Sequence, residues 1–225
     1  MAQPDTGAAT GRRRGRPPRI DRARIVAAAR ELDPETLTMQ AVAERLGVDR
    51  KALNYHVNDR ERLLELVASD ALATRLGSLQ LPHDGDWQDA VRVYTRAMRD
   101  AMIGIGALFD YVRMPLSGGE AALASVEGLL QVLVRAGFTA DEAGRTVALL
   151  AELLVSSARD AVLIERHGVH PQLVEVRRVL DAAPADAMPG LRGLRDLGLQ
   201  AGDAQLEFDL EVVLAGLEQR LARDR

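Results

Sequence analysis

The sequence predicts an all-α protein, with a three-helix helix-turn-helix head followed by a larger helical body. Apolar residues recur at the three- and four-residue spacing of amphipathic helices through most of the 225 residues. Residues 38–55 show the pattern of two short helices joined by a tight turn. Charge is also segregated: residues 1–62 hold 13 Lys and Arg against 9 Asp and Glu, and the remainder holds 16 against 24. A basic head on an acidic body is expected when only the head meets phosphate.

The composition excludes several classes of protein. The chain has no cysteine, so disulfide frameworks and thiolate metal sites are impossible, and a reducing compartment is expected. No apolar run approaches the roughly 20 residues of a membrane span, and no signal-peptide pattern follows the N-terminus. We therefore expect a soluble, cytoplasmic protein with no membrane partner.

Residues 1–19 form a basic arm that is too poor in large apolar side chains to fold alone, so we expect it to be disordered. Within it, Arg14-Gly15-Arg16-Pro17 resembles the core of an AT-hook, whose extended backbone fits a narrow minor groove. Arg14 and Arg16 are therefore candidate DNA contacts. The alternative is a tail that adds only nonspecific attraction to phosphate.

The folded head is expected to begin with a helix over residues 21–32, capped by Asp21 and stopped by Pro34. A longer helix is expected over residues 59–76, because leucine, valine and alanine recur along it at helical spacing. The head, residues 20–76, thus consists of one helix, a helix-turn-helix and a connecting helix.

The predicted helix-turn-helix lies between these two helices. Its first helix has one apolar face, formed by Met39, Val42, Ala43 and Leu46. Thr38 stands ahead of this helix as its N-cap, and Gly47 follows it, where a left-handed residue readily ends a helix. Asp49 offers a second N-cap, for a helix over residues 50–55. Such a pair lays its second helix in a DNA major groove, although an ordinary corner between two helices would give the same pattern.

The head also contains a set of short segments in a fixed order. They are Leu37-Thr38-Met39, Ala41-Val42-Ala43, Leu46-Gly47-Val48, Leu53-Asn54-Tyr55-His56-Val57, Asp59-Arg60 and Leu63-Leu64. Together, over residues 20–72, they resemble the DNA-binding domain of the TetR family of transcriptional repressors. One position departs from the family, which usually has an aromatic residue where this chain has Asn54. An asparagine there can read an adenine edge, or it can contact phosphate.

Side-chain chemistry and this resemblance together indicate DNA contacts. The candidates for base edges are Arg50, Lys51 and Asn54. The candidates for phosphate contacts are Thr38, Tyr55, His56 and Arg60, and Gln40 suits either role. For each of them the alternative is a solvated helix face, and His56 can instead cap the end of its own helix.

A linker containing Pro82 and Gly85 separates the head from the body, residues 77–225. Helices are expected in the body over residues 86–105, 107–113, 121–136, 140–167, 172–181 and 204–222. Residues 183–202 hold two Pro and four Gly, which predicts a long flexible loop.

Two of these helices carry apolar residues that suit a dimer interface. The predicted dimerisation residues are Leu150, Leu154 and Ala158 on the earlier helix and Leu210, Val213, Leu214 and Leu217 on the last. Two such helices from each protomer would form a four-helix interface in a homodimer. The alternative is that they are buried within one protomer. A head that reads a palindrome needs a two-fold partner, which favours the dimer.

Several segments of the body recur in a known ligand-binding domain. They are Asp86-Trp87-Gln88-Asp89, Gly137-Phe138, Met188-Pro189, Phe208-Asp209-Leu210-Glu211 and Gly216-Leu217-Glu218. They resemble the tetracycline-repressor branch of the TetR family, which implies a small-molecule sensor. Magnesium–tetracycline recognition in that branch relies on His, Asn and Gln side chains. An approximate alignment puts Leu76, Tyr94, Val112 and Leu129 at such positions, so we do not expect a tetracycline–magnesium site.

The predicted effector pocket is apolar and adaptable in shape. Its candidate lining residues are Trp87, Tyr94, Met98, Met102, Phe109, Tyr111 and Met114. Arg113 and Arg99 are candidate anchors for an acidic group of the ligand. The alternative is that the apolar members of this set fill the core.

The sequence shows no cysteine nucleophile, P-loop or Gly-rich dinucleotide fingerprint, so we expect neither an enzyme nor a cofactor. Glu165, His167 and His170 lie close together, but Gly168 and Pro171 mark a helix end there, which favours a capping or surface role over a metal site. The sequence therefore predicts a homodimeric regulator that binds a palindromic DNA operator and is released by a small, largely apolar molecule. A nonspecific architectural DNA-binding protein and a helical small-molecule-processing enzyme are the alternatives.

Overall fold

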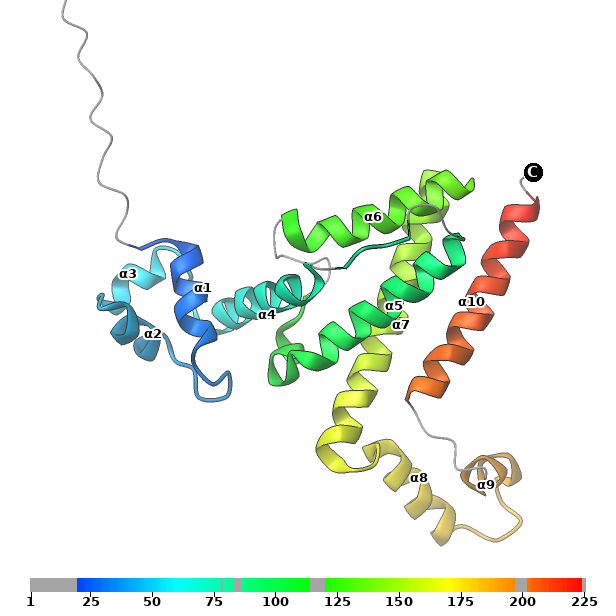
Figure 1. Cartoon of the computed structure of the whole chain (residues 1–225). Coiled ribbons are helices and arrows are strands. Elements are labelled where there is room, and N and C mark those ends of the chain that lie inside the picture. The colour runs from blue at the N-terminus through cyan, green and yellow to red at the C-terminus, as the bar shows by residue number, and fades with distance from the viewer. Residues whose placement is uncertain (1–19, 78, 83–85, 114–119, 197–201, 224–225) are drawn as a thin grey trace, which may run out of the picture.

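The computed structural model describes residues 20–77, 79–82, 86–113, 120–196 and 202–223. In this part of the chain the regular secondary structure is helical, which confirms the predicted all-α fold (Figure 1). The elements are α1 (Arg22–Arg30), α2 (Met39–Leu46), α3 (Arg50–Asn54), α4 (Arg60–Leu76), α5 (Trp87–Gly104), the 3-10 helix η1 (Gly106–Tyr111), α6 (Glu120–Ala136), α7 (Ala140–His167), α8 (Pro171–Ala182), α9 (Pro189–Asp196) and α10 (Asp203–Arg223).

Side-chain caps fix where the first helices begin. The caps are Asp21 for α1, Thr38 for α2, Asp49 for α3, Asp59 for α4 and Asp86 for α5. In each case a side-chain oxygen accepts a hydrogen bond from a backbone N–H in the first turn, at 2.9 Å in α1 and 3.1 Å in α2. These N–H groups have no partner within the helix itself, so the caps stabilise the helix starts. The predicted caps Asp21, Thr38 and Asp49 are confirmed.

Helix α4 is shared by two apolar cores. Its first half, including Leu63 and Val67, packs with α1, α2 and α3 in the head. Its second half, including Leu72 and Leu76, belongs to the body core formed with α5, α6, α7 and α10. One continuous helix is therefore anchored in both cores and connects the head to the body.

Helix α10 lies beside α5 and α7 and closes one side of the body (Figure 1). Its leucines contribute to the body core, and a fork of two hydrogen bonds fixes its first turns. Nε and Nη2 of Arg96 on α5 donate to the two carboxylate oxygens of Glu207, at 2.8 and 2.6 Å. This pair lowers the pKa of Glu207, mainly through the hydrogen bonds from Arg96.

Helix α9 occupies part of the segment 183–202, so the prediction of a long flexible loop was wrong there. Two glycines weaken this segment as an isolated helix. The guanidinium of Arg192 instead ties it to the end of α8, by donating to the carbonyl oxygens of Leu180, Ala183, Pro184 and Ala187 at 2.8 to 3.1 Å. The helix expected over residues 107–113 is also different, because it is the 3-10 helix η1 and ends at Tyr111.

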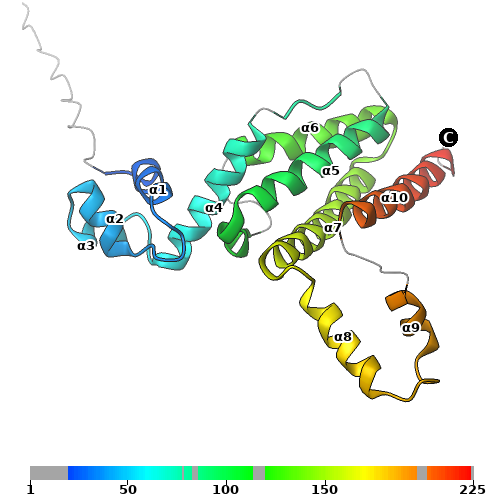
Figure 2. The same ribbon diagram turned by 60° about the horizontal axis from the view of Figure 1, so that its bottom comes forward.

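Helices α8 and α9 project away from the rest of the body in both views (Figures 1 and 2). Their exposed large apolar side chains are Val174, Val176, Val179, Leu191 and Leu194. None of the described helices has both the length and the apolar character required to cross a bilayer.

Candidate nucleic-acid interface

The turn between α2 and α3 sets the direction of the second helix. Gly47 has φ 64° and ψ 38°, in the left-handed region, and its N–H bonds back to the last turn of α2. The N–H of Val48 also donates to the carbonyl oxygen of Ala43, at 3.0 Å. These bonds satisfy carbonyl groups at the end of α2 without prolonging the helix. The predicted glycine turn is confirmed.

Helix α3 is held against the head core by Leu53, which is fully buried. Its remaining face carries Arg50, Lys51 and Asn54, all exposed. Tyr55 follows the helix and is 93 % exposed, so its ring gains almost nothing from packing within this chain. The structure thus brings the predicted base-contacting residues to one exposed face, and their contacts with DNA stay predictions.

Three of the predicted contacts surround this face. Thr38 caps α2 while its side chain remains at the surface. Gln40 is exposed on α2, and its Nε2 donates to Oε1 of Glu44 at 2.9 Å. His56 is half-buried beyond the end of α3. Their contacts with DNA also stay predictions.

The folded part of the head carries no excess of positive charge. Residues 20–62 hold eight Lys and Arg and eight Asp and Glu, so the positive excess comes from the arm. Arg14 and Arg16 belong to that arm, which lies outside the described residues. On α3, the neighbouring Asp49 is engaged as a helix cap, at 2.7 Å from the N–H of Lys51. Local positive charge is therefore concentrated on the α3 face and in the arm.

Arg60, a predicted phosphate contact, is engaged within the protein. Its Nε donates to the carbonyl oxygen of Leu37 at 2.6 Å, and its Nη2 donates to that of Pro34 at 2.8 Å. Its Nη1 donates to the hydroxyl of Tyr111, in η1 of the body, at 3.5 Å. The guanidinium therefore joins the loop before α2 to the body.

Arg113, a predicted effector anchor, also reaches across to α4. Its Nη2 lies 3.3 Å from Oε1 of Glu61, and its Nε lies 3.3 Å from Oε1 of Glu65. Tyr111 and Leu108 of η1 pack against the head core. We call this set of contacts between η1, Arg113 and the first turns of α4 the η1–α4 joint. Sequence reasoning missed Glu61 and Glu65, because residues about 50 positions apart are brought together only by the fold.

The other predicted effector residues lie mainly in the body core. Tyr94, Met98, Met102 and Phe109 are buried there together. Trp87 is partly buried and meets Phe138 edge to face, with ring centroids 5.1 Å apart. Burial raises the pKa of Tyr94 to about 12, so its hydroxyl stays protonated at physiological pH. Met114 lies outside the described residues. In this structure the core is filled by these side chains.

A cavity of about 510 Å³ lies beside Arg113, on one face of α7. Its lining residues are Val112, Arg113, Ala151, Glu152, Val155, Ser156 and Arg159. Two guanidinium groups, the carboxylate of Glu152 and three aliphatic side chains thus face one space. The two cations outnumber the one carboxylate, which suits a molecule that is apolar with an acidic group. Arg99, the other predicted anchor, is buried and bound, because its Nε donates to Oγ of Ser157 at 2.9 Å and its Nη1 lies 2.9 Å from Asp203.

Comparison with known proteins identifies the family. A model described as the tetracyclin repressor-like, C-terminal domain matches residues 80–221. The tetracycline repressor protein class A from transposon 1721 of Escherichia coli is 30% identical over 193 residues, which cover 84% of this chain and 85% of that protein. The chain belongs to the TetR family. The class C tetracycline repressor of E. coli is 28% identical over 189 residues, covering 82% of this chain and 83% of that protein.

Solved TetR-family structures share the fold. Apo ActR from Streptomyces coelicolor has a TM-score of 0.68 at 24% identity, over 92% of this chain and 98% of that one. ActR in complex with actinorhodin has a TM-score of 0.69 at 24% identity, over 90% and 96%. TetR from Acinetobacter baumannii AYE has a TM-score of 0.54 at 22% identity, over 90% and 98%. The TetR family consists of transcriptional regulators, so the alternative of a small-molecule-processing enzyme is removed.

The predicted dimerisation residues of this TetR-family body lie mostly inside the single chain. Leu150, Leu154, Ala158, Leu210, Leu214 and Leu217 are buried in the body core, and Val213 is partly buried against it. Their side chains are therefore covered before any partner arrives. The same two helices expose other apolar side chains, namely Leu149 on α7 and Phe208 and Val212 on α10. An interface through these helices would use that second face.

His170 has a capping role, one of the two roles expected near this helix end, and the helix that it caps is α8. Its Nδ1 accepts a hydrogen bond from the N–H of Gln172, at 3.3 Å, and so caps α8. Its Nε2 lies 3.3 Å from Oδ1 of Asp160 on α7, which links the two helices. Among the residues that the structure describes, no group of three or more His, Asp and Glu side chains is placed to hold a metal ion.

Proposed function

We propose that this TetR-family chain is a ligand-responsive repressor that binds an inverted-repeat operator as a homodimer. A small, largely apolar molecule with an acidic group releases it. The observation that carries the proposal is the η1–α4 joint, through which Tyr111 and Arg113 of the body contact the helix that supports the reading head.

The reading function belongs to α3. Arg50, Lys51 and Asn54 are exposed on a helix whose position is fixed by the Gly47 turn and by burial of Leu53. In a helix-turn-helix protein this helix enters the major groove, where Arg, Lys and Asn can form two hydrogen bonds with one base edge. Tyr55, His56, Thr38 and Gln40 surround it and suit phosphate contacts, which set orientation rather than sequence.

The effector is proposed to enter the cavity beside Arg113. ActR, which shares the fold, has been solved in complex with actinorhodin, and this supports a body that accommodates a small molecule. An acidic group between Arg113 and Arg159 would compete with the carboxylates of Glu61 and Glu65 for the guanidinium of Arg113. The body would then lose its ion pairs with the first turns of α4.

The proposed effector is not tetracycline with magnesium. Leu76 and Leu129 are buried in the body core and offer no metal ligand. Tyr94 is buried there as a neutral phenol, which is a poor ligand for Mg²⁺. A different ligand class is therefore needed, although the relatives named above are tetracycline repressors.

The coupling that such a mechanism requires is modest. Half-sites must lie about one helical turn apart for both heads of a dimer to engage, so a small change in the angle of α4 lowers affinity. A coupling free energy of roughly 1–3 kcal/mol changes affinity about 5- to 150-fold. The free energy lost with the partly exposed ion pairs at the joint and with the Arg60–Tyr111 hydrogen bond is of the order of this coupling free energy.

The homodimer is proposed to form through the second face of α7 and α10. Phe208 is 60 % exposed and Val212 is 58 % exposed, one turn apart on α10, and Leu149 is exposed on α7. Two long helices with such faces from each protomer would bury them in a four-helix contact. The exposed apolar side chains of α8 and α9 offer further surface to the same partner.

Selection of DNA fragments bound by the full chain tests the proposed function. The expected result is enrichment of one inverted repeat, bound far more tightly than bulk DNA of the same length. Enrichment without a common sequence would instead support the nonspecific architectural alternative. The genomic position of the enriched fragments would also indicate the regulated genes and the chemistry of the effector.

A further inference from the structure

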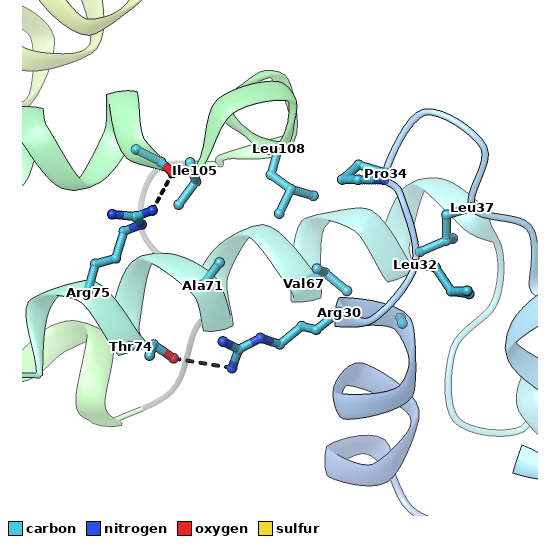
Figure 3. Close-up of a pocket in the computed structure, with 12 residues that line it drawn as sticks. Arg30, Leu32, Pro34, Leu37, Val67, Ala71, Thr74, Arg75, Ile105 and Leu108 are labelled. Atoms are coloured by element: carbon cyan, nitrogen blue, oxygen red, sulfur yellow. Dashed lines mark hydrogen bonds between the residues drawn. The ribbon is translucent and has the colours of Figure 1, made fainter. Parts of the chain in front are cut away.

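A second cavity, of about 440 Å³, lies between the head and the body (Figure 3). It is separate from the cavity beside Arg113 and shares no lining residue with it. Its walls come from the end of α1 and the loop that follows, from α4, and from the end of α5 and the start of η1. A molecule in this cavity would therefore contact the head and the body at the same time.

Most of the lining residues are apolar, and Arg30, Thr74 and Arg75 add polar surface. The aliphatic surface is provided by Leu32 and Pro34 of the head, Val67 and Ala71 of α4, and Ile105 and Leu108 of the body. The volume lies within the range of about 300–1,000 Å³ that is usual for small-molecule sites. The cavity thus has room for a molecule of about ten carbon atoms and favours an apolar one.

Two guanidinium groups, those of Arg75 and Arg30, line this space (Figure 3), and the charge of Arg30 is paired with the carboxylate of Asp70. Nη2 of Arg75 donates to the carbonyl oxygen of Gly104, at 2.6 Å. Because a carbonyl group is neutral, this bond does not compensate the charge of the guanidinium. Nη1 of Arg30 contacts Asp70 at 2.7 Å and Thr74 at 3.3 Å. Within the described part of the chain, Nε and Nη2 of Arg30 make no hydrogen bond.

Glycine at position 104 allows Arg75 to take this position. A Cβ atom built on Gly104 would lie 2.5 Å from Nη1 and 2.7 Å from Cζ of Arg75, closer than side-chain contacts permit. The guanidinium therefore rests directly against the backbone at the end of α5, and an alanine at 104 would displace it. Because the displaced group is the end of a flexible side chain, this change moves the charge without unfolding the protein.

We propose that this cavity is a second ligand site, which binds a small monocarboxylate with an apolar body. The carboxylate accepts hydrogen bonds from Arg75, since a charged donor of this kind binds carboxylates strongly. The hydrocarbon part lies against the six aliphatic side chains named above. Occupancy fixes the angle between head and body seen in this structure, and its consequence for operator binding rests on the proposed function.

Calorimetric titration of the full chain with decanoate, in the absence of DNA, tests the site. We expect decanoate binding that depends on Arg75, and no comparable binding of decyltrimethylammonium, which has the same chain length and the opposite charge. Arg75→Gln should weaken decanoate binding about tenfold or more, whereas the exposed surface variant Arg145→Gln on α7 should leave it unchanged. Because no DNA is present, failure of this binding and failure of the proposed repressor function are observed separately.

Three further variants locate the bound decanoate. Ala71→Leu should reduce binding by filling the cavity, and Gly104→Ala should reduce it by moving the guanidinium of Arg75 while keeping its charge. Arg113→Gln should leave the Arg75-dependent binding in place, because Arg113 lines the other cavity and can remove only decanoate that is bound there. Absence of decanoate binding, or binding that is lost in Arg113→Gln and kept in Arg75→Gln, would overturn the proposal.

Discussion

Nε of Arg113 lies 3.3 Å from Oε1 of Glu65, a carboxylate on α4 whose side chain is only 17 % exposed. The pair joins the end of the body segment η1 to the helix that begins in the head. Glu65 also accepts from Arg62 one turn earlier, at 2.8 Å, so the carboxylate is held in place from its own helix. Arg113 is therefore the partner that can move. A ligand that binds Arg113 would break the contacts of Arg113 with Glu61 and Glu65 on α4.

Arg113→Gln should loosen the η1–α4 joint while the protein stays folded. It removes both contacts to Glu61 and Glu65 but leaves the Arg62–Glu65 pair intact. Because Arg113 is 46 % exposed, the loss of unfolding free energy should be at most about 1 kcal/mol. Amide hydrogen exchange should become faster in the first turns of α4 and in η1. The matched variant Arg145→Gln, on α7, should leave both regions unchanged, and equal behaviour of the two variants would argue against the joint.

Asn54→Ala should relax sequence preference at one base pair of the operator. If Asn54 reads an adenine edge, the loss is about 1–3 kcal/mol for the preferred sequence and little for other sequences. Competition of the selected operator against operators changed at single positions measures this directly. A uniform loss across all sequences would show instead that Asn54 contacts phosphate.

Arg16→Ala should weaken DNA binding and flatten its dependence on salt. The folded head is electrically balanced over residues 20–62, so the arm supplies its net positive charge. Loss of one phosphate contact lowers the slope of log K against log salt concentration by roughly 0.9. Titrations at several salt concentrations give this slope, and an unchanged slope would show that the arm remains free of the DNA.

Gly47→Ala should destabilise the head by about 1 kcal/mol, because alanine pays a conformational penalty at φ 64°. No neighbouring atom lies within 4 Å of the added Cβ, so the effect is one of backbone conformation and not of collision. Gly144→Ala is the matched control, since it is equally open but lies within helix α7. It should stabilise the protein by roughly 0.5–1 kcal/mol. Urea unfolding curves in which both changes have the same sign would contradict this account.

Local features of the fold were predictable from sequence because short-range hydrogen bonds create them. Thr38 and Asp49 cap the helices for which they were predicted, and Gly47 adopts the left-handed conformation expected of a helix end. Helix α7 has the predicted bounds, residues 140–167. Helix α9 was missed because its stability depends on Arg192 bonding to carbonyl groups of the preceding segment, which no local pattern reveals.

The functional surfaces were predictable only in part. Helical periodicity shows that α10 is amphipathic but does not show which apolar residues face their own core and which face a partner. For example, Leu210 was predicted at the dimer interface but is buried within the chain, whereas Phe208 is exposed. Arg60 and Arg113 likewise owe their partners to the crossing of η1 over α4, which sequence spacing does not encode.

The central claim is that two heads, held at a fixed separation by paired bodies, read one inverted repeat. The most direct test measures affinity for the selected operator before and after insertion of about half a helical turn (about five base pairs) between its half-sites. The account predicts a loss of at least about tenfold, because the two α3 helices can no longer reach both half-sites on one face of the duplex. Equal affinity for the two duplexes would contradict it.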